Sequence, residues 1–384
     1  MLAHLRFPVE RSRGRRYPEP EHRYRNAFQR DRDRVIHSRA FRRLEAKTQV
    51  FTPGLSDHFR NRLTHTIEVA QIARTVANQL QLDEDLTEAL ALVHDIGHPP
   101  FAHAGEEELN RQMSAFGESF DHNLHALRIV ESFEQRYARF PGLNLTFEVR
   151  EGMVKHSRDP ELEEYLPGEQ PVLEAQLIDL ADEVAYNTAD LDDGFSAGML
   201  TAPDLAECVP QCRAIYEAVE AQFPAASDRE RFHEGLRHLI DILVSDLIEG
   251  TVDASRDAGV RSPEEVRRVG KRLASFARGG AETSRALKRF LFAKVYDAPL
   301  LNADRQRSME MVAELFQFFL QHPDALPEPY CEQARSEPPH RVICDYIAGM
   351  TDVFFHRTYE QLRGGAGEAK APVPPTATLP RSRP

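Results

Sequence analysis

The stretch that decides the fold class spans residues 64–97 and reads THTIEVAQIARTVANQLQLDEDLTEALALVHDIG. Its apolar residues recur every three or four positions, which is the period of an amphipathic helix. In the first half, 64–80, the residues expected to face a core are Ile67, Ala70, Ile72, Ala73, Val76, Ala77 and Leu80. In the second half, 84–96, they are Leu86, Ala89, Leu90 and Val93. Gly97 and the two prolines that follow should end this second helix.

The same period continues along most of the chain. A helix is expected over 171–188, with an inward face made of Leu173, Leu177, Ile178, Ala181, Val184 and Ala185. Further helices are expected near 105–115, 121–138, 146–156, 204–222, 228–249, 262–276, 281–296, 305–321 and 338–361. Alternating strand patterns are scarce, and the hairpin signal around 48–58 is weak. The sequence therefore predicts an all-α fold.

Composition excludes several classes of protein. The chain has 384 residues, of which 41% are hydrophobic and 28% charged, enough for a core and a charged surface. Its four cysteines are too few and too scattered for a disulfide scaffold, and Cys208 and Cys212 lack a second ligand pair for a zinc ribbon. No apolar run reaches the roughly 18 residues of a membrane span. The basic N-terminus has no apolar signal region, so we expect a cytoplasmic protein.

Charge is distributed unevenly. The net charge is −13, but residues 1–43 carry +8, which leaves −21 for the remainder. A basic arm on an acidic body suits a polyanionic ligand, and it equally suits a solvated segment without a partner. We predict a basic N-terminal arm (1–30), a helical core (31–200), a C-terminal helical region packed on it (201–363) and a disordered tail rich in Gly, Ala, Pro and Thr (364–384).

Histidines gather where the second helix ends. Of the 16 in the chain, five lie between residues 94 and 125, and they are interleaved with three acidic residues: His94, His98, His103, His122 and His125 with Asp95, Glu106 and Asp121. Packing alone rarely needs such a density of imidazole and carboxylate. The cluster therefore indicates a metal site or an acid–base site.

The pair His94-Asp95 is the centre of this hypothesis. Neutral imidazole and carboxylate are ligands for divalent cations. Neighbouring residues of a helix point about 100° apart, so both can reach one ion only near a helix end. His65 can join them if the two helices form an antiparallel pair. A carboxylate beside an apolar face is costly unless it is paired or metal-bound, which makes Asp182 the fourth candidate, with Asp179 as an alternative. Such a set leaves coordination positions for water and phosphate oxygens, as metal-assisted hydrolysis requires.

Five strings in order resemble a known family. They are AFRRLEAKTQVF (40–51), RNRLTHTIEVAQIAR (60–74), ALVHDIGHPPFAHAGE (91–106), FDHNLHALRIV (120–130) and LADEVAYNTADLDDG (180–194). Together they resemble the dGTPase-like deoxynucleoside triphosphate (dNTP) triphosphohydrolases of the HD superfamily. The resemblance implies an HD-domain helical bundle over the core, with additional C-terminal helices. It implies hydrolysis of a dNTP at the α-phosphate, which yields deoxynucleoside and tripolyphosphate.

The resemblance also implies roles for single residues. The metal ligands would be His65, His94, Asp95 and Asp182, and the acid–base pair His103 and Glu106. An imidazolium at His103 could protonate the leaving 5′-oxygen, with Glu106 fixing its tautomer. The implied substrate contacts are Arg62, His98, His122 and Lys155 at the phosphates, Arg43 at a phosphate, and Tyr186, Asp190 and Glu45 around the sugar. Many relatives carry Gln where this chain has Glu45, and relatives usually place Gln where His125 stands.

The resemblance leaves cofactor, partners and two alternatives open. Mg²⁺ or Mn²⁺ is the expected cofactor, with Fe²⁺, Ni²⁺, Co²⁺ or Zn²⁺ also compatible. The expected partners are the dNTP substrate, a dNTP or single-stranded DNA effector, and copies of the chain in a homo-oligomer such as a hexamer; no membrane partner is expected. One alternative is another HD-type nucleotide phosphomonoesterase or phosphodiesterase. The other is a nucleic-acid-binding regulatory protein with a vestigial site. No P-loop motif is present, which argues against a kinase or motor ATPase.

Overall fold

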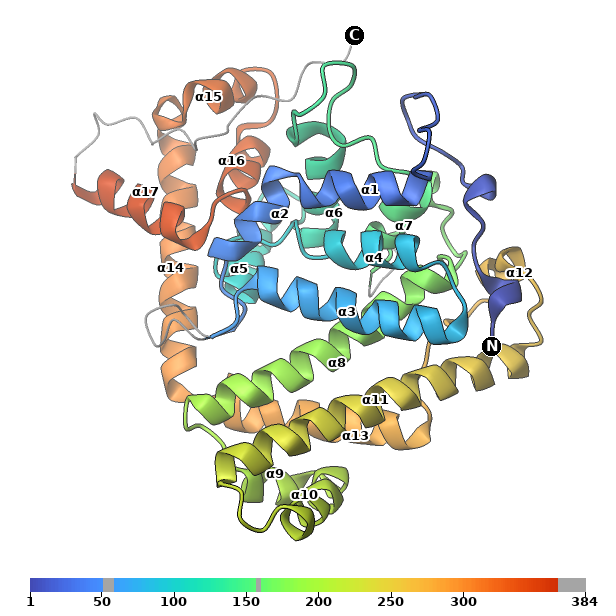
Figure 1. The fold of residues 1–384 in the computed structure, drawn as a ribbon. Coiled ribbons are helices and arrows are strands. Elements are labelled where there is room, and N and C mark those ends of the chain that lie inside the picture. The colour runs from blue at the N-terminus through green and yellow to red at the C-terminus, as the bar shows by residue number, and fades with distance from the viewer. Residues whose placement is uncertain (51–58, 157–159, 365–384) are drawn as a thin grey trace. The chain divides into compact units, whose positions relative to one another are not determined.

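The structure is a computed structural model, and it describes residues 1–50, 59–156 and 160–364 (Figure 1). Within these ranges every regular element is a helix, so the all-α prediction is confirmed. Extended pairing in the same ranges is limited to isolated bridges: Arg15 with Thr146, Thr48 with Asn61, and Gln135 with Gly142. Residues 51–58 of the weakly predicted hairpin lie outside the described residues. None of the described helices is long and apolar enough to span a membrane.

The chain forms two compact units, which we describe separately. The first unit comprises Met1–Ser12, His65–Ala91 and Lys155–Asn302, and the second comprises Arg13–Thr64, Leu92–Val154 and the chain from Ala303 onward. The chain passes between them inside α3 (Arg62–Leu80), α4 (Glu84–Val93) and α14 (Pro299–Gln321). The domain boundaries predicted from the sequence stay a prediction.

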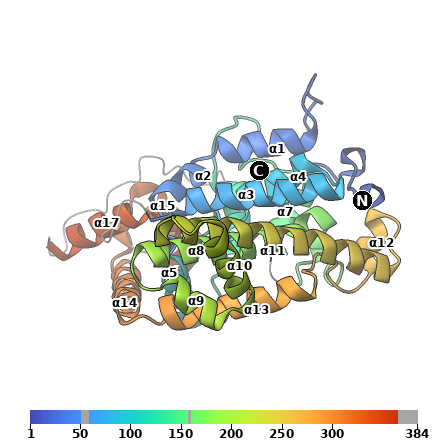
Figure 2. The same cartoon turned by 60° about the horizontal axis from the view of Figure 1, so that its bottom comes forward.

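The first unit is organised around α8 (Leu173–Ser196), a long helix that packs against α11 (Asp228–Ala258) and α13 (Arg278–Leu291). Figures 1 and 2 show these three helices side by side in both views. The remaining elements of the unit are η1 (Ala3–Leu5), η2 (Val9–Arg11), η5 (Glu163–Tyr165), α9 (Ala202–Cys208), α10 (Pro210–Gln222), α12 (Pro263–Arg268) and η6 (Phe292–Tyr296). Its core includes the apolar face of α3, with Val76, Ala77, Leu80, Leu173, Leu177 and Leu247.

Local sequence explains where the long helices begin and end. Ser227 and Glu230 form a reciprocal capping box at the start of α11, and Thr201 and Asp204 form another at α9. Gly259 ends α11 in the left-handed conformation, with φ of 65°. Pro210 begins α10 directly after α9, so the predicted helix 204–222 is two helices.

The second unit has its core among C-terminal helices. Its elements are α1 (Ala27–Ile36), α2 (Arg39–Arg43), η3 (Leu44–Ala46), α5 (Ala102–Ser114), α6 (His122–Arg128), η4 (Ile129–Phe133), α7 (Phe147–Val154), most of α14, η7 (Pro323–Ala325), α15 (Glu328–Ala334), α16 (Pro339–Ala348) and α17 (Asp352–Gly364). Helix α16 packs against α5 and α15, and α6 packs against α7. The buried core joins Leu109 and Met113 of α5 to Phe316, Ile343 and Phe355.

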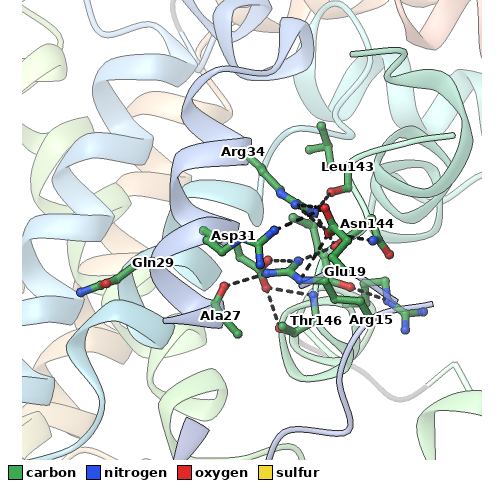
Figure 3. A network of polar contacts seen from close by, with 12 residues as sticks. Arg15, Glu19, Ala27, Gln29, Asp31, Arg34, Leu143, Asn144 and Thr146 are labelled. Atoms are coloured by element: carbon green, nitrogen blue, oxygen red, sulfur yellow. Dashed lines mark hydrogen bonds and ion pairs between the residues drawn. The ribbon is translucent and has the colours of Figure 1, made fainter. Parts of the chain in front are cut away.

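Arginines of the N-terminal stretch are bound within the second unit (Figure 3). Arg34 forms an ion pair of 2.7 Å with Glu19 and donates to the carbonyl of Leu143 at 2.8 Å. Arg15 pairs with the fully buried Asp31 and also contacts Glu19. Part of the positive charge at the N-terminus is therefore neutralised inside the fold.

The predicted helices differ from the observed ones in several places. Ile67 is 53% exposed, so its predicted place on the inward face is wrong. At 100° per residue Ile67 lies on the opposite side of α3 from the stripe centred on Ala73 and Val76. The inward residues predicted in α4 and α8 are all buried, which confirms those faces. Helices α1, α2 and α15 were not predicted, and 338–361 contains the break between α16 and α17.

Candidate functional site

In the second unit, the site is built on the turn that follows α4. Helix α4 ends at Val93, and His94 and Asp95 come next, with only 3% and 5% of their surfaces exposed. One oxygen of Asp95 accepts a hydrogen bond of 2.6 Å from the Arg62 guanidinium. The other lies 3.0 Å from Nδ1 of His98 and 3.5 Å from Nε2 of His94. This turn therefore gathers one carboxylate, one guanidinium and two imidazoles.

The electrostatics of the turn keep Asp95 ionised. Burial alone would raise its pKa, but His98, His94 and Arg62 together hold the pKa well below its usual range. Burial, followed by the charge of Arg62, holds the pKa of His98 well below its usual value. Burial and Arg62 thus oppose a further positive charge at His98, whose Nδ1 faces the Asp95 carboxylate.

Helix α6 closes one side of this turn through a close backbone approach. Asp121 caps α6 by accepting from the backbone N–H of Leu124 at 3.0 Å. A Cβ at Gly97 would lie 2.0 Å from the carbonyl oxygen of His122, so only glycine fits there. The His122 ring stacks on the His98 ring, with centroids 3.8 Å apart.

Helix α5 carries the predicted acid–base pair. Glu106 accepts from the backbone N–H of His122 at 3.0 Å and lies 2.7 Å from its Nδ1. Nδ1 of His103 is 3.8 Å from Glu106, and its side chain is 81% exposed. Burial raises the pKa of Glu106, but the contacts with His103 and His122 outweigh it and lower the pKa below the usual range. Glu106 is therefore a carboxylate shared by two histidines, with the shorter contact to His122.

Three overlapping groups of this unit have the geometry of metal ligands. Their ligand atoms lie within 4.8 Å of one another in the sets Asp95, His98 and His122; His98, His103 and Glu106; and Glu106, Asp121 and His122. Mixed imidazole and carboxylate donors suit borderline divalent cations. The predicted residues Arg62, Asp95, His98, His103, Glu106 and His122 thus come together in one unit.

In the first unit, α3 and α8 supply a second pair of predicted ligands. Nε2 of His65, which is 2% exposed, lies 2.8 Å from Oδ1 of Asp182. The alternative ligand Asp179 lies 2.6 Å from Nδ1 of His156 and also binds Arg272. His156 reaches within 3.9 Å of Asp182 as well. Asp179 is therefore held by a histidine and an arginine, whereas Asp182 faces His65.

Helix α8 also carries Tyr186 and Asp190, at i+4 and i+8 from Asp182. The buried carboxylate of Asp190 accepts from the Tyr296 hydroxyl. The Lys288 ammonium lies 5.7 Å from the centre of the Tyr186 ring. Burial, partly offset by Lys288, raises the pKa of Tyr186 to about 12. No sequence signal pointed to Tyr296 or Lys288, because both follow Asp182 by about a hundred residues and belong to no motif.

Three further residues were predicted to contact substrate: Lys155, Arg43 and Glu45. The buried Lys155 donates to the carbonyls of Leu166 and Glu169, at 2.8 Å and 2.5 Å. Arg43 donates to the carbonyl of Gly349 at 3.0 Å. Glu45 is exposed, in η3.

His125 lies on α6 and is 3% exposed. Its Nδ1 is 3.4 Å from Oδ1 of Asp345. This contact joins helix α6 to the side-chain carboxylate of Asp345 in α16.

Comparison with known proteins places these residues in a family. Residues 62–187 match the HD domain, and residues 274–361 match the phosphohydrolase-associated domain. A deoxyguanosinetriphosphate triphosphohydrolase-like protein of Geobacter sulfurreducens is 45% identical over 91% of this chain and 93% of its own length. Proteins of the same name from Azoarcus sp. and Bordetella pertussis are 45% and 46% identical, over 93% and 96% of their lengths. The chain therefore belongs to the deoxyguanosinetriphosphate triphosphohydrolase-like family of HD-domain hydrolases.

Proposed function

We propose that this protein is a metal-dependent dNTP triphosphohydrolase that acts on dGTP-like substrates. It would cleave the substrate at the α-phosphate and release deoxynucleoside and tripolyphosphate. The observation that carries the proposal is the buried set Arg62, Asp95 and His98 beside the exposed His103, in a chain that matches its relatives over nearly their whole length.

We further propose that His65, His94, Asp95 and Asp182 hold one divalent cation, with Mg²⁺ or Mn²⁺ the first candidates. The donor chemistry fits such an ion, because the four residues offer two imidazoles and two carboxylates. His65, His94 and Asp95 are at most 5% exposed, and Asp182 lies 2.8 Å from His65. When bound, the cation would polarise the phosphoryl oxygens and neutralise charge on the triphosphate.

Arg62 would contact the triphosphate. It lies three residues before His65 in α3, so both side chains emerge from one face of that helix. A guanidinium has five N–H donors and can bind a carboxylate and phosphate oxygens together; one donor of Arg62 binds Asp95. His98 and the stacked His122 would add further phosphate contacts by donating a ring N–H to a phosphate oxygen.

His103 would supply the proton that the leaving 5′-oxygen requires. Its exposure makes it accessible to a substrate, and Glu106 lies 3.8 Å from its Nδ1. A carboxylate in this position would orient the imidazole ring and fix its tautomer. Glu106 also contacts His122. It would therefore keep the proton donor His103 and the phosphate contact His122 at a fixed distance from each other.

The sugar would lie along α8. Tyr186 would face the deoxyribose and disfavour a 2′-hydroxyl, and Asp190 would line the same sugar pocket. Asp190 is fixed by Tyr296, so the acceptor would be positioned before substrate arrives. We also propose a cytoplasmic homo-oligomer that responds to a dNTP or single-stranded DNA.

Product analysis tests this function directly. The protein is incubated with each of the four dNTPs, alone and mixed, with Mg²⁺, Mn²⁺ or Co²⁺, and products are separated by ion-exchange chromatography. We expect deoxynucleoside and tripolyphosphate in equal amounts. Release of orthophosphate or pyrophosphate would instead identify an HD-type phosphomonoesterase or phosphodiesterase. A salt-dependent DNA complex without turnover of any dNTP would identify a binding protein.

A further inference from the structure

The turn that begins α5 is strained, and it precedes His103 and Glu106. Phe101 has φ of 62° and Ala102 has φ of 53°, which place two consecutive non-glycine residues in the left-handed region. That region is disfavoured for residues with a Cβ, and such a conformation persists only where surrounding contacts hold it. The contacts that hold this turn therefore influence where His103 and Glu106 lie.

Asp352, the first residue of α17, supplies one of these contacts. Its Oδ1 accepts a hydrogen bond of 3.1 Å from the backbone N–H of Phe101. Its Oδ2 accepts from the backbone N–H of Thr48 at 2.8 Å and from the Thr48 hydroxyl. The carboxylate is 4% exposed. One buried side chain thus binds the strained turn to a segment that lies earlier in the chain.

Neighbouring contacts fix the same turn from the same side. The buried Lys47 donates its ammonium protons to the carbonyl of His98 and, at 3.3 Å, to the carbonyl of Ala348. The ring of Phe101 packs edge-on against Phe355, with centroids 4.9 Å apart. The backbone from His98 to Phe101 is therefore bound at both ends by Lys47 and by the segment 348–355.

We propose that Asp352 is a positioning residue, which holds the turn at Phe101 and Ala102 so that His98, His103 and Glu106 stay in their reactive arrangement. This inference rests on the proposed function for its catalytic consequence. Asp352 lies in the stretch that matches the phosphohydrolase-associated domain, and the turn lies in the stretch that matches the HD domain. The stretch that matches the phosphohydrolase-associated domain would thus help to hold the catalytic residues in place without touching substrate.

The chain contains a matched control for this role. Asp31 is fully buried and accepts from the backbone N–H of Thr146 at 2.9 Å and from the Thr146 hydroxyl at 2.6 Å, the same pattern that Asp352 forms with Thr48 (Figure 3). Asp31 binds Thr146 and Arg15, neither of which belongs to the turn at Phe101. Asp31→Asn and Asp352→Asn therefore make the same chemical change in two buried sites. Asp31→Asn also weakens the ion pair with Arg15, so it is a demanding control for general destabilisation.

The test compares full-length Asp352→Asn, Asp31→Asn and wild type by hydrogen exchange and by steady-state dNTP hydrolysis with Mn²⁺. In Asp352→Asn an amide N–H₂ replaces one acceptor, so one backbone N–H loses its partner. We expect exchange of the amides of residues 101–106 to accelerate by about tenfold or more. We expect kcat to fall about 10²-fold, as for a misplacement of 1 Å, with KM within about twofold because Arg62, the first triphosphate contact, lies in α3 and outside the turn that Asp352 holds. Asp31→Asn should lower stability and change neither quantity.

Unchanged exchange at residues 101–106 in Asp352→Asn would overturn the proposed anchor. Faster exchange with an unchanged kcat would overturn the positioning role. Equal losses of kcat in both variants would also overturn it, because they would reflect general destabilisation. If Asp352→Asn does not fold, Thr48→Val removes one hydroxyl donor and should give a smaller effect of the same sign. If wild type hydrolyses no dNTP, the proposed function fails, and the exchange experiment still decides the anchor.

Discussion

The close approach at Gly97 allows a sharp prediction. A Cβ at this position would lie 2.0 Å from the carbonyl oxygen of His122, 2.5 Å from the backbone nitrogen of Ala126 and 2.8 Å from its Cβ. Non-bonded contacts of real Cβ atoms stay above 3.0 Å. Two of the three opposing atoms belong to backbone, so in Gly97→Ala the turn and α6 must separate by about 1 Å.

The separation has an energetic and a catalytic consequence. Overpacking of this kind costs about 1–3 kcal/mol of the free energy of unfolding. Because α6 carries His122, whose ring stacks on His98, the same shift should lower kcat about 10²-fold. Stability is measured by urea denaturation followed by circular dichroism, and kcat from the release of deoxynucleoside.

Gly235→Ala is the matched control for this substitution. Gly235 lies inside α11, and the nearest atom to its ideal Cβ is Cγ2 of Ile215 at 3.5 Å, an ordinary contact. Alanine favours a helix over glycine, so this variant should gain about 0.5–1 kcal/mol and keep its kcat. Wild-type stability and wild-type kcat in Gly97→Ala would refute the close approach of α6 to the turn that follows α4.

Three further predictions concern single side chains. His103→Ala should keep its fold and its metal, measured by plasma mass spectrometry, because the side chain is 81% exposed. Its kcat should fall about 10²–10⁴-fold, the range for a general acid. An unchanged kcat would exclude that role. Asp95→Ala should lose both metal and turnover, and retention of stoichiometric metal would exclude Asp95 as a ligand. Burial raises the pKa of Glu174 from 4.5 to about 7. Between pH 4.5 and 7 the folded state therefore binds a proton that the unfolded state has lost. The free energy of unfolding should fall by on the order of 3 kcal/mol as pH rises through this range. Glu174→Gln should flatten that slope in urea titrations at several pH values, whereas an unchanged slope would place its origin elsewhere.

The fold class and the inward faces of α4 and α8 were predictable because hydrophobic period is a local property of the sequence. Ile67 shows the limit of that reasoning: it is apolar and near the stripe in sequence, yet the 100° rotation per residue turns it outward. Helix α1 was missed because its arginines mask the apolar period. Their partners, such as Glu19 and Asp31, become visible only in the folded chain.

The candidate site also contains features that the sequence predicts and features that only the folded chain shows. Motif spacing identified the His94-Asp95 turn, and the structure places Arg62, His98 and His122 around it. Spacing could not reveal that Lys155 is bound to two carbonyls. It could not find Asp352 either, because a lone aspartate about 250 residues from the turn carries no local signal. Contacts between distant segments depend on tertiary packing, which a linear pattern does not encode.

The most direct test of the account concerns the metal. Crystals grown with Mn²⁺ and measured on both sides of the manganese absorption edge would show the ion by its anomalous scattering. We predict a single strong peak per chain, with ligand atoms of His65, His94, Asp95 and Asp182 all about 2.0–2.3 Å from it, as first-row divalent cations bind nitrogen and oxygen ligands. A peak that leaves out Asp182 or His65, or no peak at saturating Mn²⁺, would contradict the proposed metal site.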